Sequence, residues 1–167
     1  LILDSNAITS VPDSDEFFYL GQSVEMKPIP SDDDREYVVC KSLLKNPHPN
    51  IVHFYGVLAN ASLMDRALVL ETLPLRLPQV FKEKCLSLAD RFQIAIDISA
   101  ATAFLNSLQF YHNNIVPRIV LIEDLFMFPD THRTSYPFSR YRAKLSDFSH
   151  VYDPAQPDRL PTEIDIA

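Results

Sequence analysis

Apolar and polar residues alternate along the first part of the chain in a way that predicts β-strands. The segment 16–29 is rich in aromatic and β-branched residues around Gly21, and it predicts two strands joined by a short turn. The segments 51–58 and 67–71 predict two more strands, separated by a polar turn. One further short strand is expected near Ile8–Val11.

Two segments predict helices. Ser31, followed three residues later by Asp34, is typical of a capping box and predicts a helix over residues 32–45. Ser87 and Asp90 repeat that spacing at the start of a long apolar segment. Residues at three- and four-residue spacing predict a long helix there, buried over much of its circumference, through Leu88, Phe92, Ala95, Ile96, Ala100, Phe104 and Leu108.

The last third of the chain predicts mainly short strands. Strands are expected at 115–116, 120–122, 125–128 and 143–146, with a polar loop at 129–142. The chain thus combines strands and one helix, then a long helix, then short strands. This order is typical of the α+β class.

Composition narrows the possible functions. The chain has 167 residues, 47% of them hydrophobic, enough for one globular domain with a buried core. Its 15 Lys and Arg against 22 Asp and Glu give a net charge of −7, which disfavours nucleic acid and anionic membranes as partners. No apolar run approaches the roughly 20 residues that span a bilayer, and no signal peptide is visible. A cytoplasmic or nuclear location is expected.

Cysteine, histidine and glycine usage excludes several kinds of site. Cys40 and Cys85 form no C-x-x-C pattern, and the five histidines form no H-x-x-x-H pair, which argues against zinc and favours buried thiols. Gly21 and Gly56 are the only glycines, whereas average usage gives about twelve. A glycine-rich phosphate loop is therefore not expected.

Several motifs together resemble the small lobe of eukaryotic protein kinases. His48–Val57, with the sequence H-P-N-I-V-H-F-Y-G-V, closely resembles the start of that family's fourth strand. Val24–Lys27 resembles the V-A-I-K strand, and Glu36 lies where a helix glutamate pairs with its lysine. Lys27 and Glu36 could equally be an exposed strand lysine and a solvated helix residue. The resemblance extends over residues 16–153.

Downstream motifs follow the same family order. Ala67–Glu71 resembles the strand before the hinge, which puts Leu70 at the gatekeeper and Glu71 to Leu73 at the backbone that contacts adenine. The helix from Leu88 resembles helix E, and Lys144–Ser149 resembles K-L-x-D-F-G, with Asp147 as the metal-binding aspartate. The resemblance implies a two-lobe fold: a strand-rich small lobe with one helix at 1–70, a hinge at 71–78 and an incomplete helical large lobe at 79–167.

Departures from the family pattern affect its chemistry. Residues 12–18, where the glycine-rich loop is expected, contain no glycine. Pro117-Arg118-Ile119 is the stretch matched to H-R-D, so that Ile119 replaces the catalytic aspartate and Leu121 replaces the loop lysine. Arg118 is expected to anchor the activation segment or a carboxylate rather than to contact substrate. Asp124 replaces the metal-binding asparagine, and Ser149 replaces the glycine of D-F-G.

These departures predict a pseudokinase that serves as a binding or scaffold module in signalling, with a protein partner. The expected binding of ATP and Mg²⁺, the metal through Asp124 and Asp147, is weak or absent. Asp124 and Asp147 could instead be capping or turn residues. An alternative is an atypical active kinase with Glu123 or Asp124 as the base. A third is a non-functional kinase fragment, since Pro161–Ala167 resembles only the start of helix F.

Overall fold

The computed structural model describes residues 2–10, 12, 14, 16–30, 33–59, 66–84, 86–125 and 139–155. The chain divides into two compact units. The first comprises Leu1–His48 and Val52–Thr72, and the second comprises Pro49–Ile51 and Leu73–Ala167. The predicted α+β class is confirmed.

The first unit is a six-stranded sheet with one helix, in the strand order β1-β5-β6-β4-β3-β2. The pair β1 and β5 is parallel, and all the other pairs are antiparallel. The elements are β1 (Ile2–Leu3), the 3₁₀ turn η1 (Ser5–Ala7), β2 (Ile8–Ser10), β3 (Phe17–Tyr19), β4 (Gln22–Pro28), α1 (Arg35–Lys45), β5 (Phe54–Ala59) and β6 (Arg66–Glu71).

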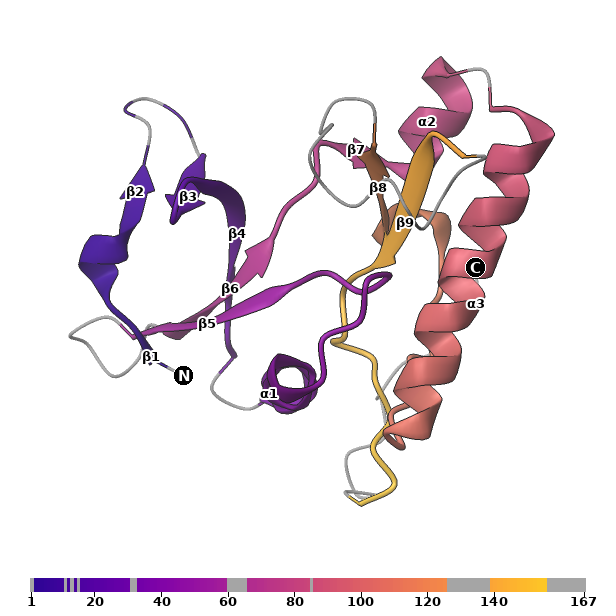
Figure 1. Cartoon of the computed structure of the whole chain (residues 1–167). Coiled ribbons are helices and arrows are strands. Elements are labelled where there is room, and N and C mark those ends of the chain that lie inside the picture. The colour runs from indigo at the N-terminus through magenta and orange to yellow at the C-terminus, as the bar shows by residue number, and fades with distance from the viewer. Residues whose placement is uncertain are drawn as a thin grey trace. The chain divides into compact units, whose positions relative to one another are not determined.

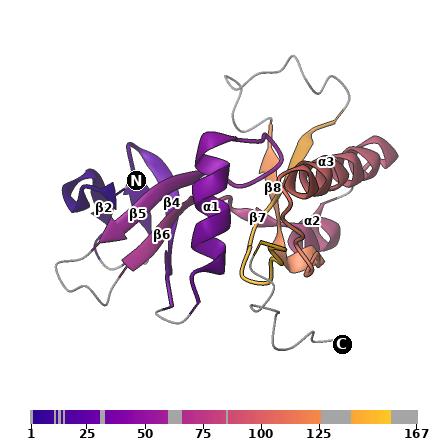
Figure 2. The ribbon, with the colours of Figure 1, turned by 90° about the horizontal axis from the view of Figure 1, so that it is seen from below.

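The two edge strands of this sheet are consecutive in sequence. Only Asp4–Ala7 separates β1 from β2, and a link of that length spans at most about 14 Å when fully extended. The sheet must therefore curl until its edges approach each other. Leu3, Val24 and Val69 are buried together in the core cluster of this curl. On the other side of the sheet, α1 lies against β5 (Figure 2).

The predicted strands of this unit are confirmed with small shifts. Leu20 and Gly21 both have positive φ, at 51° and 77°, and they form the turn between β3 and β4. The helix begins at Arg35 rather than at Asp32, which like Ser31 lies outside the described residues. Asp34 is the N-cap residue and makes no side-chain cap bond, and the predicted capping box with Ser31 lies outside the described residues.

The second unit combines a three-stranded sheet, in the order β7-β8-β9, with two helices. The longer helix, α3, lies along β9 (Figures 1 and 2). Its predicted capping box is confirmed, because Ser87 Oγ accepts from the Asp90 N–H at 3.1 Å and the Asp90 carboxylate accepts from the Ser87 N–H at 3.0 Å. The elements are β7 (Leu75–Arg76), α2 (Leu77–Glu83), α3 (Leu88–Ser107), the 3₁₀ turn η2 (Pro117–Ile119), β8 (Val120–Asp124) and β9 (Tyr141–Leu145).

Two further predictions in this unit need correction. The segment 115–116 is not a strand, whereas 120–122 is one and extends to Asp124. The stretch 71–78 is more than a connector, since it contains β7 and the start of α2; Pro78 fits there because the first helical turn does not need its N–H. Residues 126–138 and 156–167 lie outside the described part of the chain.

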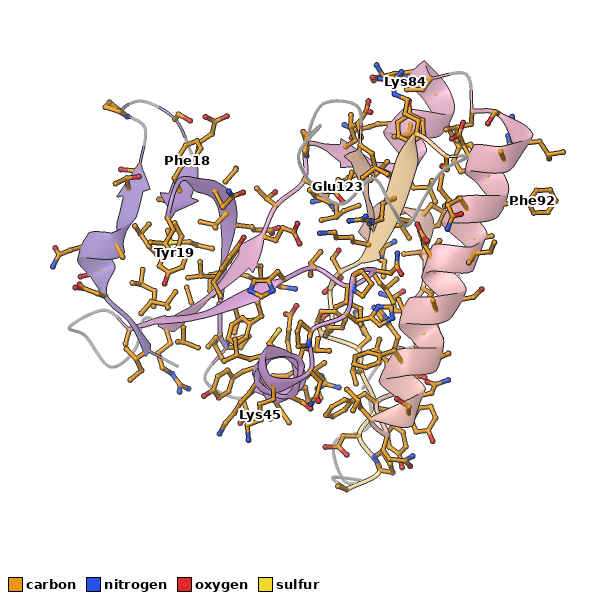
Figure 3. The ribbon with its side chains drawn as sticks, viewed as in Figure 1. Phe18, Tyr19, Lys45, Lys84, Phe92 and Glu123 are labelled. Carbon is orange, nitrogen blue, oxygen red and sulfur yellow. The ribbon has the colours of Figure 1, made fainter. Side chains whose placement is uncertain are left out.

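The long helix buries a different face from the predicted one. Leu88, Phe92 and Ile96 are 69%, 62% and 59% exposed, and Phe92 projects away from β9 (Figure 3). The helix is apolar around most of its circumference, so periodicity alone does not select the buried side. The buried residues of the helix are Asp90, Ile94, Asp97, Ala101 and Leu105. The two acids among them accept hydrogen bonds from residues outside the helix.

No helix among the described residues is both long and apolar enough to cross a membrane.

Candidate functional site

The predicted pair of Lys27 and Glu36 is present in the first unit. Lys27 lies on β4, and its Nζ is 2.8 Å from Oε2 of Glu36 in the first turn of α1. The Glu36 side chain is 12% exposed and that of Lys27 is 32% exposed. The helix dipole also favours a carboxylate in the first turn. The alternative of two separate surface residues is thereby excluded.

The three predicted hinge residues divide between the two units. Leu70 is buried in β6, and Glu71 ends that strand. Glu71 is engaged twice with His53, since its Oε2 accepts from the His53 N–H at 2.9 Å and its own N–H donates to the His53 carbonyl at 2.8 Å. Leu73 is half-buried and begins the second unit. Burial and the Glu71 charge raise the pKa of Tyr55 nearby.

The stretch 117–124, which the sequence assigned to the catalytic loop, is mostly a strand. Ile119 ends η2, and Val120–Asp124 forms the fully buried strand β8, paired with β9 in register from Val120 opposite Leu145. The Ile119 side chain is 3% exposed, so it does not project into open space beside Asp147. The predicted alignment of Ile119 with the catalytic aspartate and of Leu121 with the loop lysine therefore does not fit the positions of these side chains.

Asp124 is committed to a structural ion pair. The Arg140 Nε lies 2.9 and 3.0 Å from its two carboxylate oxygens, and hydrogen bonding to Asp124 raises the pKa of Arg140. Its neighbour Glu123 similarly pairs with Arg142 at 3.2 Å. Both oxygens of Asp124 accept hydrogen bonds from Arg140, so a Mg²⁺ ion would compete with the guanidinium for this carboxylate. Within the described parts of the chain, no three His, Cys, Asp or Glu side chains gather as a metal site.

Asp147 and its neighbours form a compact turn after β9. Asp147 has a φ of 60°, a conformation that aspartate tolerates better than most residues. The Ser149 hydroxyl donates to its Oδ1 at 2.8 Å. Phe148 is fully buried. The residue that replaces the glycine of D-F-G thus hydrogen-bonds to the predicted metal-binding carboxylate.

His112, which the sequence reading passed over, lies against this turn. Its Nε2 is 3.1 Å from the Ser146 carbonyl, and its ring centroid is 5.6 Å from that of Phe148. Burial lowers the pKa of this histidine, which is 3% exposed. Tyr111 and Tyr152 bond reciprocally through their backbones at 3.0 and 2.8 Å, which fixes the segment before His112 to the segment after Phe148.

Comparisons with known proteins agree with the fold described above. Residues 29–159 match the family model for protein tyrosine and serine/threonine kinases. A chain in the crystal structure of the yeast RNA Pol II CTD kinase CTDK-1 complex has a similar fold, with a TM-score of 0.62 and 15% sequence identity. The match covers 83% of this chain and 42% of that one. No curated protein matches by sequence.

The chain belongs to the protein tyrosine and serine/threonine kinase family. Its α+β fold is that of a protein kinase-like small lobe with part of a large lobe.

The family's H-R-D-L-x-x-x-N pattern has a better fit five residues upstream of the one first chosen. Counted from His112, it aligns Asn114 with the aspartate, Ile115 with the leucine and Ile119 with the asparagine. The pattern then ends where β8 begins, as a loop before a strand must. The retained histidine was the signal that could have located it.

Arg118 falls at a variable position of this pattern. Its side chain is exposed, and its carbonyl accepts from Nη1 of Arg76 at 2.9 Å. Among the described residues the Arg118 guanidinium makes no ion pair, so the expected anchoring of another segment is not observed there.

Proposed function

We propose that this kinase-family chain is a pseudokinase, a domain that has lost phosphoryl transfer, binds ATP weakly or not at all, and acts as a protein-binding scaffold in signalling. The observation that carries the proposal is the loop between Tyr111 and β8. Counted from His112, its base position holds Asn114, and its metal-ligand position holds Ile119. An amide cannot accept the proton of a substrate hydroxyl as a carboxylate does, and an alkyl side chain binds no metal.

The acidic residues near this loop are poor substitutes for the missing catalytic base. Asp124 and Glu123, the bases suggested for an atypical active kinase, lie in a buried strand and pair with Arg140 and Arg142. Asp147 accepts a hydrogen bond from Ser149. This argues for the inactive alternative, because losing the base alone lowers the rate by about 10²- to 10⁴-fold.

The phosphate cover is also incomplete. The connection between β2 and β3 holds the position of the glycine-rich loop, yet residues 12–18 contain no glycine. Backbone that carries side chains folds less closely over phosphates. We therefore expect a millimolar dissociation constant for Mg-ATP, about −4 kcal/mol of binding.

A phosphotransfer assay with radiolabelled ATP tests the loss of activity. Wild type is expected to equal the D147A variant, and N114D alone is expected to remain inactive because catalytic parts act as a unit. The double variant N114D/I119N restores the aspartate and the asparagine of the family pattern, and we expect it to gain phosphotransfer activity. Transfer by wild type above the D147A background would overturn the proposal in favour of an atypical kinase.

The protein-partner part of the proposal draws on the exposed apolar side chains of α3. Leu88, Phe92 and Ile96 lie four residues apart on one exposed stripe, which is typical of surfaces that are covered in an assembly. The similar yeast chain was itself solved as part of a kinase complex. Co-purification from the native source, compared between wild type and F92D, tests this part. A set of bound proteins unchanged by F92D would contradict a role for the stripe.

A further inference from the structure

Strand β4 carries a second charged side chain on the same face as Lys27. Side chains alternate between the faces of a strand, so Glu25 and Lys27 point to one side and Val24 to the other. The pairing with β6 agrees, because Glu25 lies opposite the buried Leu70, whereas Val24 packs with Val69 in the core of the curled sheet. Glu25 is thus a neighbour of the lysine along the face on which α1 lies.

Three charged side chains near this part of the face, Glu25, Lys27 and Glu36, sum to one negative charge. Lys27 is already paired with Glu36 at 2.8 Å, which neutralises both. Glu25 adds one more carboxylate, about 7 Å along the strand from Lys27. It is exposed, and among the described residues it makes no hydrogen bond or ion pair. A polyphosphate that approaches Lys27 therefore meets one positive and two negative side chains.

The position also differs from the family pattern. In V-A-I-K the residue two before the lysine is alanine, which is small and uncharged. Here that residue is Glu25.

We propose that Glu25 is an electrostatic determinant that lowers the affinity of this site for nucleoside polyphosphates. The inference rests on the proposed function, because it takes Lys27 as the phosphate-binding lysine of a site that binds nucleotide weakly. The Glu25 carboxylate repels the phosphate groups of the nucleotide and does not repel its uncharged base. Its effect should therefore depend on ligand charge and on ionic strength.

The test compares binding of ATP and of adenosine to wild type, E25Q and E25A by isothermal titration calorimetry. E25Q keeps the shape of the side chain and removes its charge. We expect about tenfold tighter ATP binding in E25Q, a gain that shrinks at high salt, and unchanged adenosine binding. Glu83 is an exposed glutamate on α2, and E83Q is the control for a general change in net charge. The melting temperature of each variant verifies folding.

A double variant shows whether the effect acts through the lysine. In a K27M background, E25Q is expected to give little or no gain for ATP. Equal ATP affinity of wild type and E25Q, or no measurable ATP binding by either, would overturn the role of Glu25 and leave the pseudokinase proposal intact. A gain for adenosine equal to that for ATP, or a gain only in E25A, would show that Glu25 acts by shape. Micromolar ATP binding by wild type would instead refute the weak-binding part of the proposed function.

Discussion

Asp97 is the buried carboxylate whose removal should affect the second unit most. It lies in the middle of α3, is 1% exposed, and accepts from the backbone N–H of Ala143 in β9 at 2.8 Å. Gln93 donates to its other oxygen at 2.9 Å. Asp97→Ala leaves the Ala143 N–H buried without an acceptor, which costs about 1–3 kcal/mol. Asp97→Asn retains a carbonyl oxygen for that donor, and we expect it to cost less than about 1 kcal/mol.

Urea denaturation at neutral pH measures the difference from the shift in midpoint at constant slope. Asp153 provides a matched control, because its carboxylate also accepts from a backbone N–H, that of Ala155 at 2.9 Å, but in an exposed position. Asp153→Ala should therefore change stability by less than about 0.5 kcal/mol. Equal losses in D97A and D97N would refute the reasoning, since they would show that charge rather than the acceptor stabilises the contact.

The pH dependence of the same variants has a definite sign. Burial raises the pKa of Asp97 above its ordinary value, so the folded state holds this proton more tightly than the unfolded state. Its contribution to stability is fully present below the unfolded pKa, near 3.9, and is lost as pH rises through the folded pKa. D97N should lack this decline. A steeper loss of stability with rising pH in D97N than in wild type would contradict the assignment.

Three further predictions concern other parts of the chain. Arg140→Gln should destabilise the protein by about 1–3 kcal/mol in urea, because it leaves the buried Asp124 carboxylate without its partner, and adding D124N should recover part of the loss. In a C85S background, Cys40 should react with a thiol reagent only after unfolding, since burial raises its pKa; rapid labelling of the folded protein would contradict this. Phe92→Asp should reduce binding of a hydrophobic dye with less than about 0.5 kcal/mol lost in urea, whereas a large loss would show that Phe92 is packed.

Local sequence patterns predicted the elements whose cause is local. The turn at Gly21 and the capping box of Ser87 and Asp90 follow from residue types at fixed spacing, whereas the pair of Lys27 and Glu36 was predicted from the resemblance to the kinase family. The buried face of α3 did not follow, because an apolar helix presents several equivalent stripes and tertiary packing selects one.

The catalytic-loop region shows the same limit. Pro117-Arg118-Ile119 shares with H-R-D only the arginine, whereas His112 keeps the histidine that starts the pattern. The contacts of His112 with the Ser146 carbonyl 34 residues later and with the Phe148 ring support this choice of histidine. Neither contact is visible in a local window. The strand at Val120–Asp124 shows where the loop ends, and this fixes the alignment of the motif to the sequence, which the motif alone left open.

The three residues Pro49–Ile51 make the second unit discontinuous in sequence. Asn50 donates to the Ala143 carbonyl at 3.1 Å and accepts from the Leu145 N–H at 2.8 Å, so β9 is completed by a segment that lies between α1 and β5 in the chain. A recombinant fragment beginning at Leu73 would lack that segment and leave buried polar groups of β9 without partners. The second unit therefore cannot be obtained whole with a single cut at Leu73. A substitution at Asn50, which lies in the sequence between two elements of the first unit, is therefore expected to destabilise the second unit.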